Sequence, residues 1–177
     1  MRPTVALFAS SRRHGNTGQL MDWVAGALNI EVIDLAQRTM SAFDYEHKNR
    51  GDDFEPLLEQ VLEFEQLIFA TPVYWYAMSP PMKVFIDRIS DLLDLPDLLA
   101  KGRRLRGKSA HVLCTSIEDE ATPCFVTAFR ETFNYLGMRY GALLHANCRD
   151  GYLPACYERD VNAFVEQLRG DTRQRHA

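Results

Sequence analysis

The sequence has few cysteines and lacks the pairings that mark common metal or redox sites. Its four cysteines, at positions 114, 124, 148 and 156, form no C-x-x-C pair, which excludes zinc ribbons and thioredoxin-type redox centres. The five histidines form no H-E-x-x-H or similar ligand pair. We therefore predict no metal site, and we expect Cys114, Cys124 and Cys148 to be buried structural thiols.

Long hydrophobic runs and an excess of basic residues are also missing. The first apolar run, Val5–Ala9, is too short for the core of a signal peptide, and no run approaches the ~18 apolar residues of a membrane span. The net charge of −4 argues against a nucleic-acid partner. We expect a cytoplasmic protein that binds neither membrane nor nucleic acid.

Short apolar runs alternate with segments of helical periodicity. We expect one domain at residues 1–170 and a polar tail at residues 171–177. Five runs are typical of strands buried on both faces of a sheet: Val5–Ala9, Val32–Leu35, Leu67–Ala70, Val112–Cys114 and Ala142–Leu144. Apolar stripes predict five helices at 20–28, 57–62, 82–93, 125–136 and 161–168. The alternation predicts an α/β fold, a parallel sheet inside a three-layer α/β/α sandwich.

Helix ends and loops are marked by proline, glycine and charge. Ser79 and Thr122 each precede a proline and are predicted N-caps, and Gly137 is a predicted C-cap. Residues 39–53 and 94–108 are predicted loops. The basic run in the second loop fits either a solvated connection, which we favour, or a contact to a nucleotide phosphate.

The turn after the first strand has the chemistry of an anion site. Residues 9–17 read ASSRRHGNT and lead from a buried strand into an amphipathic helix, whose free N–H groups and dipole favour negative charge. Ser10 and Thr17 add hydroxyls, Arg12 can hold two phosphate oxygens, and Gly15 allows close approach. Because G-x-x-x-x-G-K-[ST] and G-x-G-x-x-G are absent, the loop suits a terminal phosphomonoester. The alternative is a polar turn with Thr17 as a plain helix cap.

Three consecutive aromatic residues, Tyr74, Trp75 and Tyr76, follow the third strand. They predict a wall for a flat ligand, or else they pack under a neighbouring loop or at a dimer interface. In a doubly wound five-stranded sheet of flavodoxin-like order 2-1-3-4-5, strands one and three are neighbours at the switch point where flavodoxin binds FMN. A phosphate loop and an aromatic wall there match the two ends of FMN.

Two motifs resemble the NAD(P)H-dependent FMN reductase-like family, which has a flavodoxin-like fold. The stretch Ser10-x-Arg12-x-x-Gly15-Asn16-Thr17 is similar to its G-S-x-R-x-x-G-N-T phosphate loop. The stretch Thr71-Pro72-Val73-Tyr74-Trp75, followed by Met78-Ser79, Lys83 and Phe85-Ile86-Asp87-Arg88, is similar to its T-P-V-Y-W-x-x-M-S-x-x-x-K-x-F-I-D-R segment.

The resemblance implies where a flavin binds. FMN phosphate contacts are implied at Ser10, Arg12, Asn16 and Thr17, and contacts around the isoalloxazine at Pro72, Val73, Tyr74 and Trp75. A third flavin loop is expected after the fourth strand, beginning at Thr115 and Ser116. In many relatives this loop is rich in glycine, whereas here it carries Glu118, Asp119 and Glu120, which either serve the following helix dipole or lower the flavin potential.

The resemblance also implies an activity. A homodimer or homotetramer would transfer hydride from NAD(P)H to FMN and then reduce a small-molecule acceptor: a quinone, nitro, azo, metal or flavin compound. Because the flavin carries this chemistry, we nominate no catalytic side chain. The alternatives are a flavodoxin-type electron carrier without its own NAD(P)H reductase activity and a partner-binding module that has lost its flavin. Arg12 and the modest net charge of −4 argue against the carrier.

Overall fold

A computed structural model, which describes residues 3–170, contains a five-stranded, all-parallel sheet of order β2-β1-β3-β4-β5. The strands are β1 (Thr4–Phe8), β2 (Glu31–Asp34), β3 (Gln66–Pro72), β4 (Ser109–Ser116) and β5 (Arg139–Asn147). Every residue of β1 and β3 is buried, as expected for the continuous apolar runs that predicted them. The predicted fold class and strand order are confirmed. The predicted polar tail, residues 171–177, lies outside the described residues.

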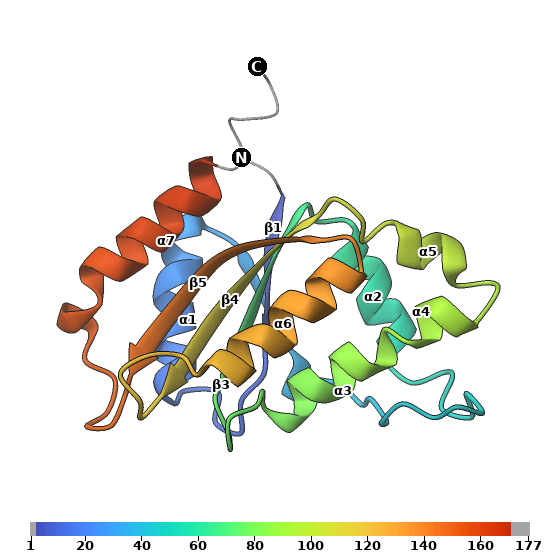
Figure 1. The fold of residues 1–177 in the computed structure, drawn as a ribbon, viewed down its shortest axis with the longest axis horizontal. Helices are drawn as coiled ribbons and strands as arrows, with labels where there is room; N and C mark the ends of the chain where they lie inside the picture. Colours follow the sequence, from blue (N-terminus) through green and yellow to red (C-terminus); the bar gives the residue numbers. More distant parts are fainter. Residues whose placement is uncertain (1–2, 171–177) are drawn as a thin grey trace.

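Helices cover both faces of this sheet (Figure 1). One face carries α1 (Asn16–Leu28) and α7 (Glu158–Gly170), whose apolar residues share a core with Ala6 and Phe8 of β1. The other face carries α2 (Phe54–Leu62), α3 (Pro80–Arg88), α4 (Asp91–Asp94) and α6 (Pro123–Tyr135), with α5 (Leu99–Arg103) beside α4. Short 3-10 helices lie at Leu35–Gln37 and Pro154–Cys156. The carboxyl ends of β1, β3 and β4 therefore meet at one edge, between the two helical layers.

The third predicted helix is interrupted. Its apolar stripe predicted one helix over residues 82–93, but α3 ends at Arg88 and α4 begins at Asp91. The amide of Ile89 bonds to the carbonyl three residues back, at 3.1 Å, which tightens the chain. Arg88, which is fully buried, ion-pairs with Asp91 at 2.7 Å across this turn. A buried ion pair thus lies at the break in a helix that the sequence predicted as continuous.

The predicted loop at 94–108 is wrong in part, because it contains α5. Leu98 and Leu105 are buried on either side of this helix and anchor it. Two basic side chains of the segment pair with α2 and its C-cap: Lys101 Nζ lies 2.5 Å from a Glu59 carboxylate oxygen, and Arg104 Nη2 lies 2.7 Å from a Glu63 carboxylate oxygen. The segment is thus a salt-bridged connection, and these two bases are turned toward α2. Residues 39–53 contain no helix or strand, as predicted.

The predicted capping positions of α3 and α6 are confirmed, but the capping chemistry differs. Ser79 and Thr122 are the N-cap residues of α3 and α6, yet neither side chain bonds to its helix. The hydroxyl of Ser79 instead donates to the carbonyl of Ala9 at 2.9 Å, which ties the end of β1 to the start of α3. Gly137 follows α6 with a φ of 71°, the left-handed conformation of a helix C-terminus, as predicted.

Candidate functional site

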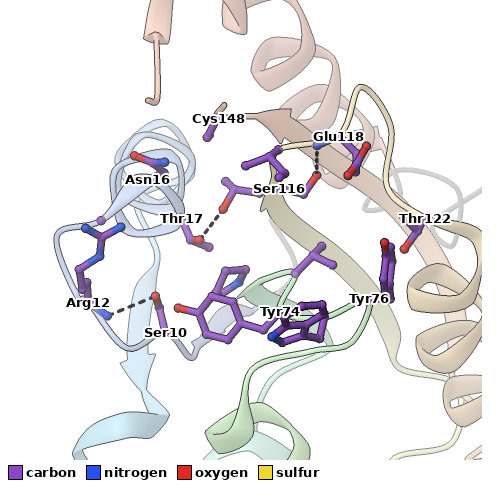
Figure 2. A pocket seen from close by; sticks show the side chains of 16 residues that line it. Ser10, Arg12, Asn16, Thr17, Tyr74, Tyr76, Ser116, Glu118, Thr122 and Cys148 are labelled. Atoms are coloured by element: carbon purple, nitrogen blue, oxygen red, sulfur yellow. Dashed lines mark hydrogen bonds between the residues drawn. The ribbon is translucent and has the colours of Figure 1, made fainter. Parts of the chain in front are cut away.

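One pocket of about 450 Å³ opens where the loops after β1, β3 and β4 converge (Figure 2). All of the predicted cofactor-binding residues line it: Ser10, Arg12, Gly15, Asn16, Thr17, Pro72, Val73, Tyr74, Trp75, Thr115 and Ser116. Five further residues complete the lining: Tyr76, Ile117, Glu118, Thr122 and Cys148. The first four of these lie in the loops that follow β3 and β4, whose position was a signal for them. Nothing in the sequence pointed to Cys148, which follows β5.

The loop after β1 is organised around the N-terminus of α1. Gly15 is the N-cap, so Thr17 is not the plain cap of the alternative interpretation. The Arg12 amide donates to Ser10 Oγ at 3.3 Å, while the neighbouring Arg13 pairs with Asp22 at 2.6 Å. Among residues 3–170, no acidic side chain forms an ion pair with Arg12. Arg12 is therefore the available cation of this loop, beside the unpaired amides of a helix start.

The fold requires glycine at Gly18, the third residue of α1, and the sequence analysis did not predict this. A Cβ atom at this position would lie 1.8 Å from the carbonyl oxygen of Arg13. The loop can close onto its helix only because this position has no side chain.

The aromatic segment forms a tight hairpin at the pocket mouth. The backbones of Tyr74 and Ala77 exchange hydrogen bonds of 2.8 and 3.0 Å, and the two residues between them, Trp75 and Tyr76, have φ values of 47° and 64°. Two positive φ values are the geometry of a type I′ turn, which favours glycine and asparagine. Trp75 is 94% exposed, so this ring does not pack under a neighbouring loop. Strained backbone of this kind concentrates at ligand sites.

Tyr74 faces the phosphate loop. Its hydroxyl donates to Ser11 Oγ at 3.4 Å. Burial acts to raise the pKa of Tyr74, but hydrogen bonds with Ser11 and Ser10 and the charge of Arg12 outweigh it, and the pKa is lowered. The aromatic wall and the anion loop are thus in direct contact.

The loop after β4 is attached on both sides. Thr115 Oγ1 lies 2.6 Å from Thr17 Oγ1, and its carbonyl accepts the Val73 amide at 2.9 Å. Ser116 Oγ lies 2.8 Å from His145 Nε2 and accepts the Glu118 amide at 3.1 Å. Burial lowers the pKa of His145, which favours the neutral ring.

The three acids after β4 have different surroundings. Glu118 lines the pocket, whereas Asp119 accepts a hydrogen bond from Asn147 Nδ2 at 2.9 Å. No acid occupies the first turn of α6, whose residues are all described. Glu118 is therefore the acid placed to act on a ligand.

The cysteines are inert where they are buried. Cys114 is buried, as predicted, and burial raises its pKa to about 12. Cys148 is also buried, and the pKa of this thiol is raised to about 11. The prediction for Cys124 is wrong: it is exposed at the start of α6, because it lies off the face that Phe125 and Phe129 direct into the core.

Within residues 3–170, no cluster of three or more His, Cys, Asp or Glu side chains is suited to hold a metal ion. Across the same residues, no helix combines the length and the apolar character that a bilayer crossing requires.

An all-parallel sheet of order 2-1-3-4-5 with a pocket across the ends of β1 and β3 defines a flavodoxin-like protein. Solved structures share this fold. The Trp repressor binding protein from Bacillus subtilis is 24% identical, with a TM-score of 0.70, over 93% of this chain and 97% of that one. The FMN-dependent NADH-azoreductase from Bacillus anthracis str. Ames Ancestor is 14% identical, with a TM-score of 0.68, over 97% of this chain and 99% of that one.

The sequence places the chain within a family. The model of the NADPH-dependent FMN reductase family matches residues 3–142, and the chain belongs to this family. It is also 30% identical over 151 residues to YwqN of Bacillus subtilis (strain 168), which carries the name of an NAD(P)H-dependent FMN-containing oxidoreductase. That match covers 80% of this chain and 83% of YwqN. The chain is therefore an enzyme of an NAD(P)H-dependent, FMN-containing oxidoreductase family.

Proposed function

We propose that this pocket binds FMN, that NAD(P)H reduces the bound flavin, and that the flavin then reduces a small-molecule acceptor. The acceptor belongs to one of the classes implied by the resemblance to the FMN reductase-like family: a quinone, nitro, azo, metal or flavin compound. The observation that carries the proposal is the meeting of two unlike surfaces in one pocket. The N-terminus of α1 with Arg12 supplies an anion site, and the Tyr74–Ala77 hairpin supplies a flat aromatic wall.

The donor set fits FMN at both ends. Arg12, the hydroxyls of Ser10 and Thr17 and the first amides of α1 hold the phosphate, with Gly15 and Asn16 at its edge. The ring lies against the backbone and side chains of Pro72 to Trp75 and against Thr115 and Ser116. A site for one terminal phosphate favours FMN over FAD.

The chain's own residues orient the cofactor and exclude water. When bound, the flavin supplies the hydride and electron chemistry. Ser79 holds the β1 loop and α3 together, because its hydroxyl donates to the Ala9 carbonyl and its amide donates to Thr71 Oγ1 at 3.0 Å. The Thr17–Thr115 hydrogen bond fixes the phosphate loop against the loop that faces the ring. These contacts set the position of the reactive ring relative to a donor at the pocket mouth.

The wider assignment is part of the same proposal. Residues 1–170 form one FMN-binding domain, and the protein works in the cytoplasm as a homodimer or homotetramer without nucleic-acid or membrane partners. The exposed Trp75 and Tyr76 at the pocket mouth support association, because large aromatic side chains in such a position are typical of a covered surface.

Turnover distinguishes the reductase from an electron carrier. The protein is loaded with FMN, and the oxidation of NADH and of NADPH is followed at steady state with p-benzoquinone as a neutral acceptor. We expect oxidation of at least one of the two nucleotides that depends on bound FMN. Bound FMN without nucleotide oxidation would support the carrier, and failure to bind FMN would overturn the site itself.

A further inference from the structure

The pocket is electrically asymmetric. Among the described residues that line it, two carry a formal charge, Arg12 and Glu118. Figure 2 shows them on opposite sides, Arg12 beside the start of α1 and Glu118 near Thr122 and Tyr76. The cation and the anion thus mark different ends of one cavity.

These two charges differ in what compensates them. On the proposed function, on which this inference rests, the phosphate of FMN neutralises Arg12. Glu118 is exposed, and within residues 3–170 no cation forms an ion pair with its carboxylate. The cofactor therefore removes the positive charge from the pocket and leaves the negative one.

Glu118 is held at its position by the backbone. Its amide donates to Ser116 Oγ at 3.1 Å, and Ser116 is in turn 2.8 Å from His145. The start of the loop after β4, which carries Glu118, is thereby fixed relative to β5. The Glu118 carboxylate therefore lies at the rim of the pocket on a turn that hydrogen bonds hold in place.

The surrounding charges leave an excess of negative charge. Arg149 lies close by, because its guanidinium donates to the Ile117 carbonyl at 2.8 Å. Against this one cation stand Glu118, Asp119 and Glu120, so the segment 117–120 with Arg149 carries three negative charges and one positive charge, a net of −2. Any acceptor that reaches the ring from this side meets a negative potential.

We propose that Glu118 is a specificity residue that selects neutral or cationic electron acceptors and disfavours anionic ones. Coulomb attraction raises the local concentration of a cation at the rim and lowers that of an anion, and salt screens both effects over about 10 Å. The two-electron-reduced flavin anion loses two electrons and one proton when it returns to FMN. Two equivalents of a one-electron acceptor take up those electrons, so the charge of the acceptor can be varied without changing this balance.

The test uses two one-electron acceptors of opposite charge. FMN-loaded protein is reduced anaerobically with dithionite and mixed in a stopped-flow instrument with hexaammineruthenium(III), a trication, or with ferricyanide, a trianion. Each second-order rate constant is divided by the rate constant with neutral p-benzoquinone. This normalisation removes changes in flavin potential, and the use of pre-reduced enzyme removes NAD(P)H binding.

Three variants give the comparison. In Glu118→Gln, the ruthenium-to-ferricyanide ratio should fall about threefold to tenfold at low salt. Arg149→Gln should move the ratio in the opposite direction. Glu65→Gln removes the same charge from an exposed residue just before β3, at the amino edge of the sheet and opposite the pocket, and should leave the ratio unchanged.

An unchanged ratio in Glu118→Gln would overturn the inference and leave the proposed function intact. So would equal changes with all three acceptors, because those would reflect potential or structure. A wild-type protein that retains no FMN would instead overturn the proposed function, and this inference with it.

Discussion

The side-chain oxygens of Thr17 and Thr115 lie 2.6 Å apart, although 98 positions separate the two residues in the chain. Thr17 is in the first turn of α1 and Thr115 is near the end of β4, and both are buried. This hydrogen bond joins the proposed phosphate loop to the loop that faces the flavin ring. The spacing of the two ends of the pocket is therefore fixed before any ligand arrives.

Replacing one of these threonines should cost more than replacing both. Thr115→Val leaves the Thr17 hydroxyl buried without its partner, which should lower the free energy of unfolding by about 1–3 kcal/mol. Thr17→Val/Thr115→Val removes both hydroxyls at constant shape and should recover part of that loss. Urea denaturation of the four proteins in a double-mutant cycle measures this coupling, and strictly additive losses would show that the bond contributes nothing.

Arg12 should recognise the phosphate and not the ring. A charge-assisted contact to phosphate is worth about 1.5–3 kcal/mol, so Arg12→Ala should weaken FMN binding about tenfold or more. Riboflavin, which has no phosphate, should bind to wild type and variant with similar affinity. Arg13→Ala is the matched control, because Arg13 is already paired with Asp22. Flavin fluorescence titration gives all these affinities. Equal losses of affinity for FMN and riboflavin would show that Arg12 does not contact the phosphate.

The turn at Tyr74–Ala77 should lower the stability of the fold, because Trp75 and Tyr76 adopt left-handed backbone conformations there. Tyr76 has a φ of 64° and is 59% exposed, so Tyr76→Gly removes left-handed strain and little buried surface. We expect the flavin-free protein to gain about 0.5–1 kcal/mol in free energy of unfolding. Tyr135→Gly, in the last turn of α6, should instead lose about 1 kcal/mol. Thermal melts of both variants decide this, and a loss of stability in Tyr76→Gly would mean that the turn is not strained.

The buried ion pair behind the site should make stability depend on acid. Arg88 is fully buried, and its Nη1 lies 2.5 Å from Oδ2 of Asp52. Burial acts to raise the pKa of Asp52, but the hydrogen bonds with Arg88, Ser41 and Phe54 lower it below its ordinary value of 3.8. Because the folded pKa is the lower one, the stabilisation is complete above pH 3.8 and is lost as the pH falls from there toward the folded pKa.

Asp52→Asn should therefore lose about 3 kcal/mol of unfolding free energy at pH 7, because it leaves Arg88 without one of its two charged partners. The gap between variant and wild type should narrow below about pH 4. Urea denaturation at a series of pH values, with the exposed Asp94→Asn as the control, measures the gap. A gap that stays constant down to pH 2 would contradict the assigned pairing.

Much of this structure could be predicted from the sequence, because the order of apolar and polar residues along each segment determines which helix or strand it forms. The central strands were predictable since a strand buried on both faces is apolar at most positions, and the pocket followed because parallel strands end at one edge of a sheet. The edge strands β2 and β5, predicted to be buried on both faces as well, are partly exposed because each has a neighbouring strand on one side only. The break after Arg88 was not predictable from the apolar stripe, since the buried Arg88 at this position pairs both with Asp91 across the turn and with Asp52, which is distant in the chain. The left-handed turn at Trp75 and Tyr76 opposes the preferences of those residues, so only the assembled site reveals it.

The identity of the bound flavin decides whether this pocket is an FMN site. The protein is purified, denatured by heat, and the released cofactor is separated by chromatography against FMN, FAD and riboflavin standards. A pocket with Arg12 and the start of α1 at one end and the Tyr74–Ala77 hairpin at the other predicts FMN as the dominant species. A dominant FAD peak, or protein that releases no flavin and takes up none when FMN is added, would show that this pocket is not an FMN site.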